Sequence, residues 1–323
     1  MHRRSFLTAS LGSLAAGCAP AGATLYSGAA LAFGTTVRVA LFETDSVRAT
    51  AAIDAALHEL RAVDSLMSIY DERSQVFQLN RDGELADSDP RLLVVLAQAR
   101  ALSLATRGAF DITVQPLWRA YREAPQANGR PLPGVALRAG AKVGWRRLQA
   151  GPDGVRFTQA GMQLTLNGLV QGYAADLALA SLRARGITDA LVDAGEFAAL
   201  GGRAGQGPWR VGVADPRQAG MLAASLALDG RCVATSGDYG SSFTPDFVHH
   251  HIFDPATGES PQELASVTVV APSAMVADGL STAFMVMGAR RSHALAAGMP
   301  NVDLMTINKR GLVWKSPRFP AAA

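Results

Sequence analysis

Apolar and polar positions follow two different spacings along this chain, which together predict a mixture of helices and strands. Between residues 46 and 66 apolar side chains recur at helical spacing, whereas residues 36–42 alternate like a strand with one buried face. The same reasoning predicts further helices over residues 75–80, 90–106, 168–185, 274–287 and 292–297. It predicts further strands over residues 145–148, 155–158, 162–166, 190–193, 209–214, 223–228, 231–235, 250–253 and 267–271, and around residues 304 and 313.

Capping residues mark several of these helix ends. Ser74 and Asp89 precede helical patterns, Pro90 suits a first turn, and Gly108 and Gly186 follow the last turns. Strands and helices do not alternate strictly, so we expect the α+β class, with mixed or antiparallel sheets and packed helices, rather than a doubly wound sheet. Proline and glycine cluster over residues 125–134, which predicts a surface excursion.

Length and composition predict one large domain, or two closely packed α/β subdomains, over residues 33–319. The chain has 323 residues, 49% of them hydrophobic, which is enough to bury a sizeable core. Its 30 basic residues nearly balance 27 acidic residues. We therefore expect no nucleic-acid partner.

The first 23 residues have the layout of a twin-arginine export signal. Arg3 and Arg4 precede a short apolar stretch, and Ala21-Gly22-Ala23 fits an A-x-A cleavage point. The apolar stretch is too short to span a bilayer. The residues before Cys18 also loosely match a lipoprotein signal, so the alternative is a lipid anchor on Cys18. Either signal predicts a periplasmic protein.

The two cysteines of the chain are Cys18 and Cys232. Because Cys18 is removed or lipidated under either signal, we expect no internal disulfide. Cys232 lies in an apolar run, which favours a buried strand residue over a nucleophile.

Asp278 and Thr282 are candidate metal ligands. Four residues apart on a helix, they share one face, and their oxygen atoms suit Mg²⁺. The alternative is that Asp278 and Ser281 lie on the exposed side of an amphipathic helix. Their neighbours are apolar or small, which favours burial.

Two other polar stretches could contact a phosphorylated ligand. A helix that opens at Asn167-Gly168 would present backbone N–H groups to a pyrophosphate, although a simple strand-to-helix turn explains the glycine equally. His249, His250 and His251 suggest zinc, but alternate residues of a strand face opposite sides and no further ligands complete a tetrahedral set. His251 is instead a candidate proton acceptor or phosphate contact.

Single residues elsewhere are weaker candidates for ligand contacts. Asp111 lies in an apolar setting, where it would accept from an adenine or ribose group or anchor nearby N–H groups. Tyr70 and Asn80 flank the first helices. The turn at Ser236-Gly237 would close over a ligand or form a plain hairpin.

These clusters, in this order, resemble the FAD:protein FMN transferase family (the ApbE flavin transferases). The matching segments span nearly the whole chain after the signal: Met67-Ser68-Ile69-Tyr70 with Leu79-Asn80, Gly108-Ala109-Phe110-Asp111-Ile112-Thr113, Gly172-Tyr173-Ala174-Ala175-Asp176, Ala234-Thr235-Ser236-Gly237-Asp238-Tyr239, His250-His251-Ile252-Phe253-Asp254-Pro255-Ala256-Thr257-Gly258, and Ala277-Asp278 through Thr282.

The resemblance implies an enzyme that binds FAD, uses Mg²⁺ and attaches FMN to a Thr or Ser hydroxyl of a partner protein, releasing AMP. The implied partner is the flavin-acceptor domain of a membrane redox complex. Asp278 and Thr282 would hold the metal with the backbone carbonyl of Gly168, and Asp278 and His251 would act in catalysis. The residues implied to line or flank the FAD site are Phe33, Tyr70, Asn80, Ala109, Phe110, Asp111, Thr165, Gln171, Ser236, Gly237, Ile252 and Ser281.

Four positions depart from the family pattern. Gln171 replaces a usual Lys or Glu, Thr165 a frequent Asp, Phe33 a common Met, and Glu196 belongs to a run that replaces Gly-Gly-Asp. Two alternatives remain beside FMN transfer. One is an FAD pyrophosphatase that uses water as acceptor, and the other is a non-catalytic flavin-binding assembly factor.

Overall fold

The computed structural model describes residues 7–8, 22–123 and 131–322. Helices pack against antiparallel sheets, which confirms the predicted α+β class. The signal predicted over residues 1–23, including Cys18, lies outside the described residues apart from 7–8 and 22–23, so it stays a prediction. Within the described ranges, no helix combines the length and apolarity needed to cross a bilayer.

An eight-stranded antiparallel sheet runs through the molecule in the order β14-β13-β12-β11-β8-β7-β3-β2. Its strands are β2 (Thr24–Ala32), β3 (Thr35–Glu43), β7 (Ala190–Asp193), β8 (Phe197–Leu200), β11 (Cys232–Gly237), β12 (Leu264–Ala271), β13 (Asp303–Asn308) and β14 (Val313–Lys315). Two three-stranded sheets comprise β1 (Leu7–Thr8), β9 (Arg210–Ala214) and β10 (Leu222–Ala227), and β4 (Glu84–Leu85), β5 (Leu148–Gly151) and β6 (Gly154–Phe157).

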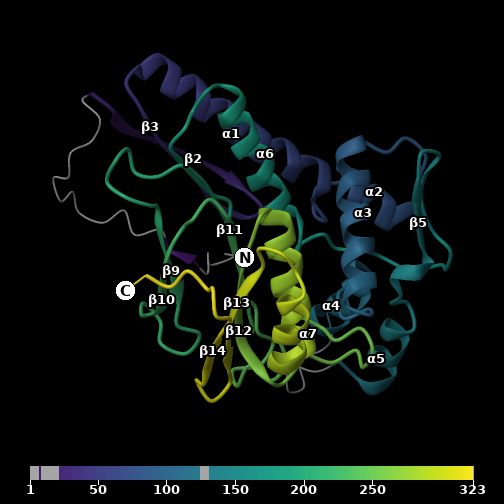
Figure 1. Ribbon diagram of the computed structural model, residues 1–323. Helices are drawn as coiled ribbons and strands as arrows, with labels where there is room; N and C mark the ends of the chain where they lie inside the picture. Colours follow the sequence, from purple (N-terminus) through teal and green to yellow (C-terminus); the bar gives the residue numbers. More distant parts are fainter. Residues whose placement is uncertain (1–6, 9–21, 124–130, 323) are drawn as a thin grey trace.

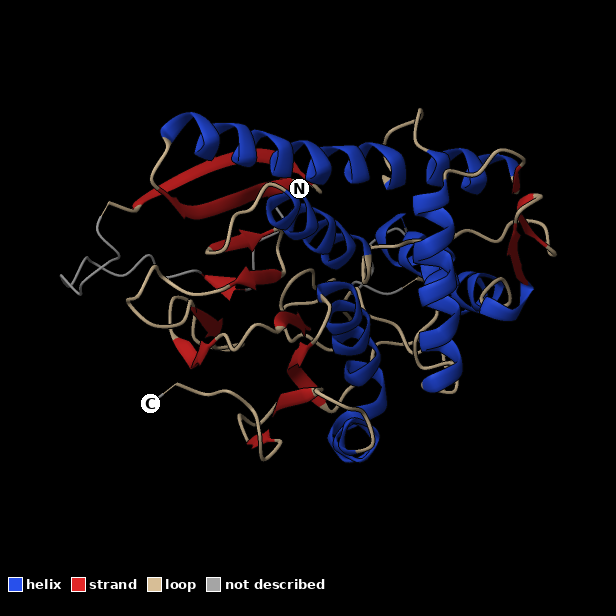
Figure 2. Ribbon diagram, turned by 45° about the horizontal axis from the view of Figure 1, so that its top comes forward, coloured by secondary structure: helices blue, strands red, loops and turns tan. Residues whose placement is uncertain are grey.

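The helices divide into two groups. The first group packs on the main sheet and consists of α1 (Ser46–Met67), α6 (Val170–Ala184) and α7 (Ala274–Ala297). The second group lies together with β5 at the other side of the molecule and consists of α2 (Gln75–Asp82), α3 (Pro90–Ala105), α4 (Gln115–Glu123) and α5 (Pro133–Gly140) (Figures 1 and 2). Gly168 lies in the segment that leads into α6, Phe110 lies between α3 and α4 of the second group, and Asp278 and Thr282 lie in α7 of the first group.

Side chains cap the starts of three helices, and the caps at Ser74 and Asp89 were predicted. Asp45 accepts hydrogen bonds from the first backbone N–H groups of α1, Ser74 caps α2, and Asp89 caps α3 with Pro90 in the first turn. These side chains satisfy N–H groups that have no partner within the helix. Local sequence therefore fixes where these three helices begin.

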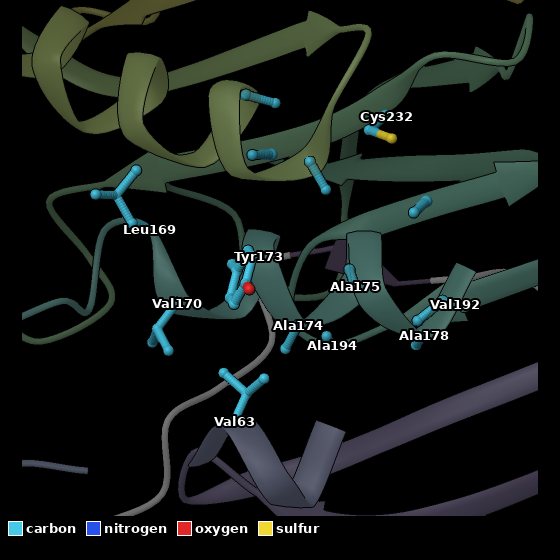
Figure 3. Close-up of a cluster of buried hydrophobic side chains, with 14 of the residues drawn as sticks. Val63, Leu169, Val170, Tyr173, Ala174, Ala175, Ala178, Val192, Ala194 and Cys232 are labelled. Atoms are coloured by element: carbon cyan, nitrogen blue, oxygen red, sulfur yellow. The ribbon is translucent and has the colours of Figure 1, made fainter. Parts of the chain in front are cut away.

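Small side chains bring α6 close to its neighbours. Figure 3 shows Ala174, Ala175 and Ala178 of α6 in the core cluster, with Val63 of α1 on one side. At Gly172 an added Cβ would lie 2.3 Å from the carbonyl oxygen of Ala274, so the starts of α6 and α7 are in backbone contact. This contact brings the polar residues of both helices to one place.

Three predicted strands are wrong or shifted. Residues 162–166 are extended but unpaired, because the N–H and C=O of Leu164 both bond to the side-chain amide of Asn80. Of residues 250–253, only His250 has a β partner, in an isolated antiparallel bridge with Ser242, and Ser260 Oγ bonds both the N–H and the C=O of His250. Residues 145–147 form a 3₁₀ turn, and the strand begins only at Leu148.

Helix boundaries also differ from the predictions. Residues 167–169 form a turn and α6 begins at Val170, so Gly168 precedes the helix. The break predicted between the two C-terminal helices is confirmed: α7 consists of two helical parts joined by a kink at Gly288, whose φ of 77° is not helical. The sequence pattern did not predict β2, β4, β8, α4 or α5, and β2 places ordered sheet before Phe33. Of the predicted surface excursion, residues 124–130 lie outside the described residues and Pro133 begins α5.

Candidate functional site

Gly168, Thr282 and Phe110 meet where the two helix groups join. An added Cβ at Gly168 would lie 2.9 Å from Thr282 Oγ1 and 3.5 Å from the ring of Phe110. An added Cβ on Gly279, next to Asp278, would lie 3.7 Å from the carbonyl oxygen of Gly168. Two of the expected metal ligands, Gly168 and Thr282, are therefore neighbours although more than a hundred residues separate them.

Asp278 is the buried acid of the site, with only 4% of its surface exposed. Its Oδ2 accepts a hydrogen bond of 3.2 Å from the backbone N–H of Gly172, in the first turn of α6. That N–H would otherwise close the first helical turn onto the carbonyl of Gly168. The carboxylate takes the place of this carbonyl as acceptor, so the Gly168 oxygen remains available to a cation.

A row of hydroxyl groups continues the site from α7 to the end of β11. Ser236 Oγ lies 2.7 Å from Ser281 Oγ and 3.1 Å from Thr282 Oγ1, and Ser281 Oγ donates to the carbonyl of Asp278 over 2.8 Å. Each hydroxyl has one proton, so Ser281 accepts from Ser236 and Thr282 in turn donates to Ser236. This assignment leaves the lone pairs of Thr282 Oγ1 for a further contact.

The chemistry of these donors suits a hard cation. A carboxylate, a hydroxyl and a backbone carbonyl supply only oxygen atoms, which Mg²⁺ prefers, and leave coordination positions for water or phosphate oxygens. Among the described residues, no group of three or more His, Cys, Asp or Glu side chains is placed to hold a metal. The donor set of Gly168, Asp278 and Thr282 has one carboxylate and no thiolate or imidazole, which is the chemistry that a magnesium ion would require.

The three histidines lie in a loop and occupy different environments. Burial lowers the pKa of His250 to about 4, so this ring is neutral at ordinary pH. Its Nε2 donates to the carbonyl of Pro261. His251 is half-buried, and both its backbone N–H and its Nδ1 lie within hydrogen-bond distance of the carbonyl of Ser241, at 2.9 and 3.1 Å. Because a carbonyl only accepts, Nδ1 carries the proton and Nε2 carries the lone pair in the neutral ring.

Asp111 and Asn80 serve as internal anchors in this structure. Asp111 Oδ1 accepts from the N–H and hydroxyl of Thr113, and Oδ2 accepts from the N–H of Trp145 at 2.9 Å. Burial raises the pKa of this carboxyl, although its hydrogen bonds oppose the rise. Asn80 bonds both backbone groups of Leu164. Of the two roles expected for Asp111, the structure supports the anchor.

The other expected flavin-site residues are distributed around this junction. Phe110 and Ile252 are buried in the main core, and Ala109 is half-buried beside Phe110. Phe33 lies in the β2–β3 turn with a φ of 55° and is 8% exposed. Tyr70 is 70% exposed after α1.

Three further candidates have structural partners. Gln171 Nε2 donates to the carbonyl of Ala194 over 2.7 Å, and Thr165 Oγ1 accepts from the N–H of Asn167 at 3.3 Å. Gly237 ends β11 beside the ring of Tyr239, where an added Cβ would lie 2.2 Å from the ring.

Glu196, the fourth departure from the family pattern, is buried and accepts from the N–H of Thr235. Both Gln171 and Glu196 are thus tied to the backbone around β8 and β11. The unusual side chains at these positions have structural roles that their sequence context did not indicate.

Two acidic residues of the matching segments have contacts that the sequence did not predict. Asp176 accepts three hydrogen bonds from the start of α7, and Asp238 forms a two-pronged ion pair with Arg217 while fully buried. Cys232 is buried as expected, and burial raises its pKa to about 12, so it is no nucleophile at ordinary pH. The sequence signal for the two acids was their position among small, apolar residues.

Known proteins are similar to this chain over most of its length. The model of the ApbE family matches residues 33–306. The FAD:protein FMN transferase of Treponema pallidum is 34% identical over 313 residues, covering 87% of this chain and 84% of the relative. That of Salmonella typhimurium is 30% identical over 300 residues, covering 88% and 86%.

Solved structures agree over almost the whole length. The ApbE protein of Thermotoga maritima has a TM-score of 0.81 at 28% identity, over 91% of this chain and 97% of the other. The flavin transferase ApbE from Vibrio cholerae has a TM-score of 0.80 at 25% identity, over 92% and 98%. The chain therefore belongs to the ApbE family.

Proposed function

We propose that this protein is an Mg²⁺-dependent FAD:protein FMN transferase, which moves FMN from FAD to a Thr or Ser hydroxyl of a partner protein and releases AMP. The proposal is supported mainly by the close approach of Gly168, Asp278 and Thr282 at the first turn of α6. Their three oxygens would hold the metal. When bound, Mg²⁺ would neutralise charge on the pyrophosphate.

The start of α6 would bind the diphosphate of FAD. Free N–H groups and the positive end of a helix dipole favour phosphate oxygens. α6 has no side-chain cap of its own, and its Gly172 N–H already donates to the carboxylate of Asp278.

Phe110 supplies buried apolar surface next to the start of α6, with Ser281 of α7 and Ser236 at the end of β11 beside it. The predicted turn at Ser236-Gly237 is instead the last part of strand β11, and the turn follows at Asp238.

His251 would take the proton of the acceptor hydroxyl through Nε2, since Nδ1 is held by the carbonyl of Ser241. A bond forms between the acceptor oxygen and the phosphorus of the FMN part. The bond from that phosphorus to the bridging oxygen breaks, and AMP leaves with the electron pair. A hydroxyl is almost fully protonated at neutral pH, so a positioned base is worth roughly a hundred- to ten-thousand-fold in rate.

We further propose that the acceptor is a flavin-bearing domain of a membrane redox complex outside the cytoplasm. The twin-arginine layout of the first 23 residues supports export to the periplasm, with Cys18 as the site of a lipid anchor if the lipoprotein signal is used. Balanced charge gives no reason to expect nucleic acid as a partner.

The test is to incubate the purified protein with FAD, Mg²⁺ and an acceptor domain, following AMP release and the mass of the acceptor. An FMN adduct on a Thr with equal release of AMP supports transfer. AMP without an adduct indicates a pyrophosphatase that uses water, and neither product indicates a non-catalytic binding protein. Asp153→Ala, at an exposed position in the β5–β6 turn, is a control that should transfer FMN like the wild type.

A further inference from the structure

Asp176 lies on α6 but makes its hydrogen bonds to the first turn of α7. Its Oδ2 accepts from Ser273 Oγ at 2.7 Å and from the N–H of Met275 at 3.0 Å, and its Oδ1 accepts from the N–H of Ala274 at 2.8 Å. The first turn of α7 contains no acidic residue. A carboxylate from a neighbouring helix thus satisfies N–H groups and complements the dipole of α7.

The same two helices touch through their backbones. An added Cβ at Gly172 would lie 2.3 Å from the carbonyl oxygen of Ala274 and 2.7 Å from the Cα of Met275. Asp176 and Gly172 are four residues apart on α6 and therefore face α7 together. The carboxylate and the glycine fix both the spacing and the register of the two helix starts.

The register decides where the candidate metal ligands lie. Asp278 follows Ala274 by one helical turn, and its Oδ2 returns to α6 at the N–H of Gly172. Thr282 follows after one more turn and lies beside Gly168. Each helix start is therefore held by a carboxylate from the other helix, and a shift of α7 would move two ligands relative to the third.

We propose that Asp176 is a positioning residue for the metal site, which holds the first turn of α7 so that Asp278 and Thr282 face the carbonyl of Gly168. The proposal rests on the proposed function. A carboxylate is required because three donors converge on it. In Asp176→Asn one oxygen would remain, and the new NH₂ group would face donors.

The experiment measures how Mg²⁺ changes FAD binding, by titrating Mg²⁺ at a fixed FAD concentration and following flavin fluorescence. Loss of a residue that orients metal ligands typically costs 10- to 100-fold in metal affinity. Asp176→Asn should therefore raise the Mg²⁺ concentration at half-saturation by about tenfold or more. Binding of FAD without Mg²⁺ should stay close to that of the wild type.

Asp45→Asn is the matched control, because Asp45 also accepts from N–H groups in the first turn of a helix. That turn of α1 lies at the far end of α6 from the site, since Arg48 donates to the carbonyls of residues 185–186, which follow α6. Asp45→Asn should lower thermal stability without moving the Mg²⁺ midpoint. Ser273→Ala is the second variant, and it serves if Asp176→Asn does not fold. It removes one of the three donors to Asp176 and should raise the midpoint by a smaller amount.

The outcomes separate this proposal from the proposed function. A raised Mg²⁺ midpoint in Asp176→Asn or Ser273→Ala, with Asp45→Asn unchanged, supports it. An unchanged Mg²⁺ midpoint in folded Asp176→Asn overturns the positioning role and leaves the metal site intact. If only Ser273→Ala folds, an unchanged midpoint in that variant overturns the positioning role in the same way. If Mg²⁺ has no effect on FAD binding even in the wild type, the metal site itself is refuted, and the positioning role with it.

Discussion

Replacing Gly172 by Ala tests the backbone contact between α6 and α7 on which the candidate site depends. The new Cβ would lie 2.3 Å from the carbonyl oxygen of Ala274 and 2.5 Å from its carbonyl carbon. Carbon atoms in contact normally lie about 3.5 Å apart. Both clashing atoms belong to the backbone, so the helix starts must separate by about 1 Å, which would stretch the bond between Asp278 and the Gly172 N–H.

The expected energy follows from two opposing effects. Alanine is better than glycine in a helix by about 1 kcal/mol, whereas overpacking typically costs about 1–3 kcal/mol. At Gly172 the clash is with backbone and lies at the upper end, so we expect a net loss of about 2 kcal/mol in the free energy of unfolding. The Mg²⁺ concentration at half-saturation of FAD binding should rise with it.

Two other glycines provide a graded comparison. An added Cβ at Gly279 would meet Leu102 and Leu169, but only the ends of their side chains, at 2.3 and 2.8 Å. These ends can move, so Gly279→Ala should cost less than about 1 kcal/mol. At Gly140 of α5 the nearest atom would be Leu117 Cδ2 at 4.0 Å, and Gly140→Ala should stabilise by about 0.5 kcal/mol.

Denaturant unfolding of the three variants measures this order directly. We expect Gly140→Ala to be the most stable, followed by the wild type, Gly279→Ala and Gly172→Ala. A Gly172→Ala variant as stable as Gly140→Ala, with an unchanged response to Mg²⁺, would show that the close approach of α6 and α7 has been misread.

Further predictions concern the loop between β11 and β12 and its contacts. His251→Ala should slow FMN transfer about 100- to 10,000-fold in single-turnover assays and leave FAD binding nearly unchanged; an unaffected rate would exclude His251 as the base. Arg217→Met removes the ion-pair partner of the buried Asp238 carboxylate and leaves Lys309 Nζ at 3.8 Å as the remaining cation. The free energy of unfolding, measured with denaturant, should fall by about 3 kcal/mol. A fall below about 0.5 kcal/mol would show that the Arg217–Asp238 ion pair contributes little. Burial lowers the pKa of His250 from 6.5 to about 4 in the folded chain, so between these two pH values the unfolded chain binds a proton at His250 and the folded chain does not. The free energy of unfolding should therefore fall by about 3 kcal/mol as the pH is lowered from 6.5 to 4. His250→Asn should remove most of this slope, and an equally steep slope would contradict the assignment.

The sequence was most informative where the periodicity or the capping residues were clear. Residues 46–66 have apolar side chains at helical spacing and residues 90–106 follow a cap at Asp89, and α1 and α3 begin at the predicted residues. β2 was missed because its small side chains give no alternation of size, and Gly28 within it is required by the close approach of Ile53 from α1. α4 and α5 were missed because they are short and adjoin a region rich in proline and glycine.

Long-range bonds between side chain and backbone explain most of the remaining errors. The apolar run at 162–166 was predicted as a strand, but Asn80, 84 residues away from Leu164, supplies the hydrogen bonds that a neighbouring strand would have made. The anchor role of Asp111 depends on Trp145, which is also distant in sequence. Such partners cannot be derived from local spacing.

The candidate metal ligands could be predicted in part because helical spacing links them. Asp278 and Thr282 had to share one face of a helix, whereas the carbonyl of Gly168 was expected as the third oxygen only from the resemblance to the family. The sequence could not indicate that Asp278 would accept from Gly172 in place of Gly168. That exchange depends on how α7 packs against α6, which Gly172 and Asp176 determine together.

The most direct test compares the wild type with Asp278→Ala in the transfer reaction. Each protein is incubated with FAD, Mg²⁺ and an acceptor domain, and the intact mass of the acceptor is followed over time, with EDTA added to a parallel sample. The wild type should add one FMN to a Thr of the acceptor only when Mg²⁺ is present, and Asp278→Ala should add none while still binding some FAD. Equal labelling by both proteins, or labelling that persists in EDTA, would contradict the assignment of a magnesium-dependent transferase site to Gly168, Asp278 and Thr282.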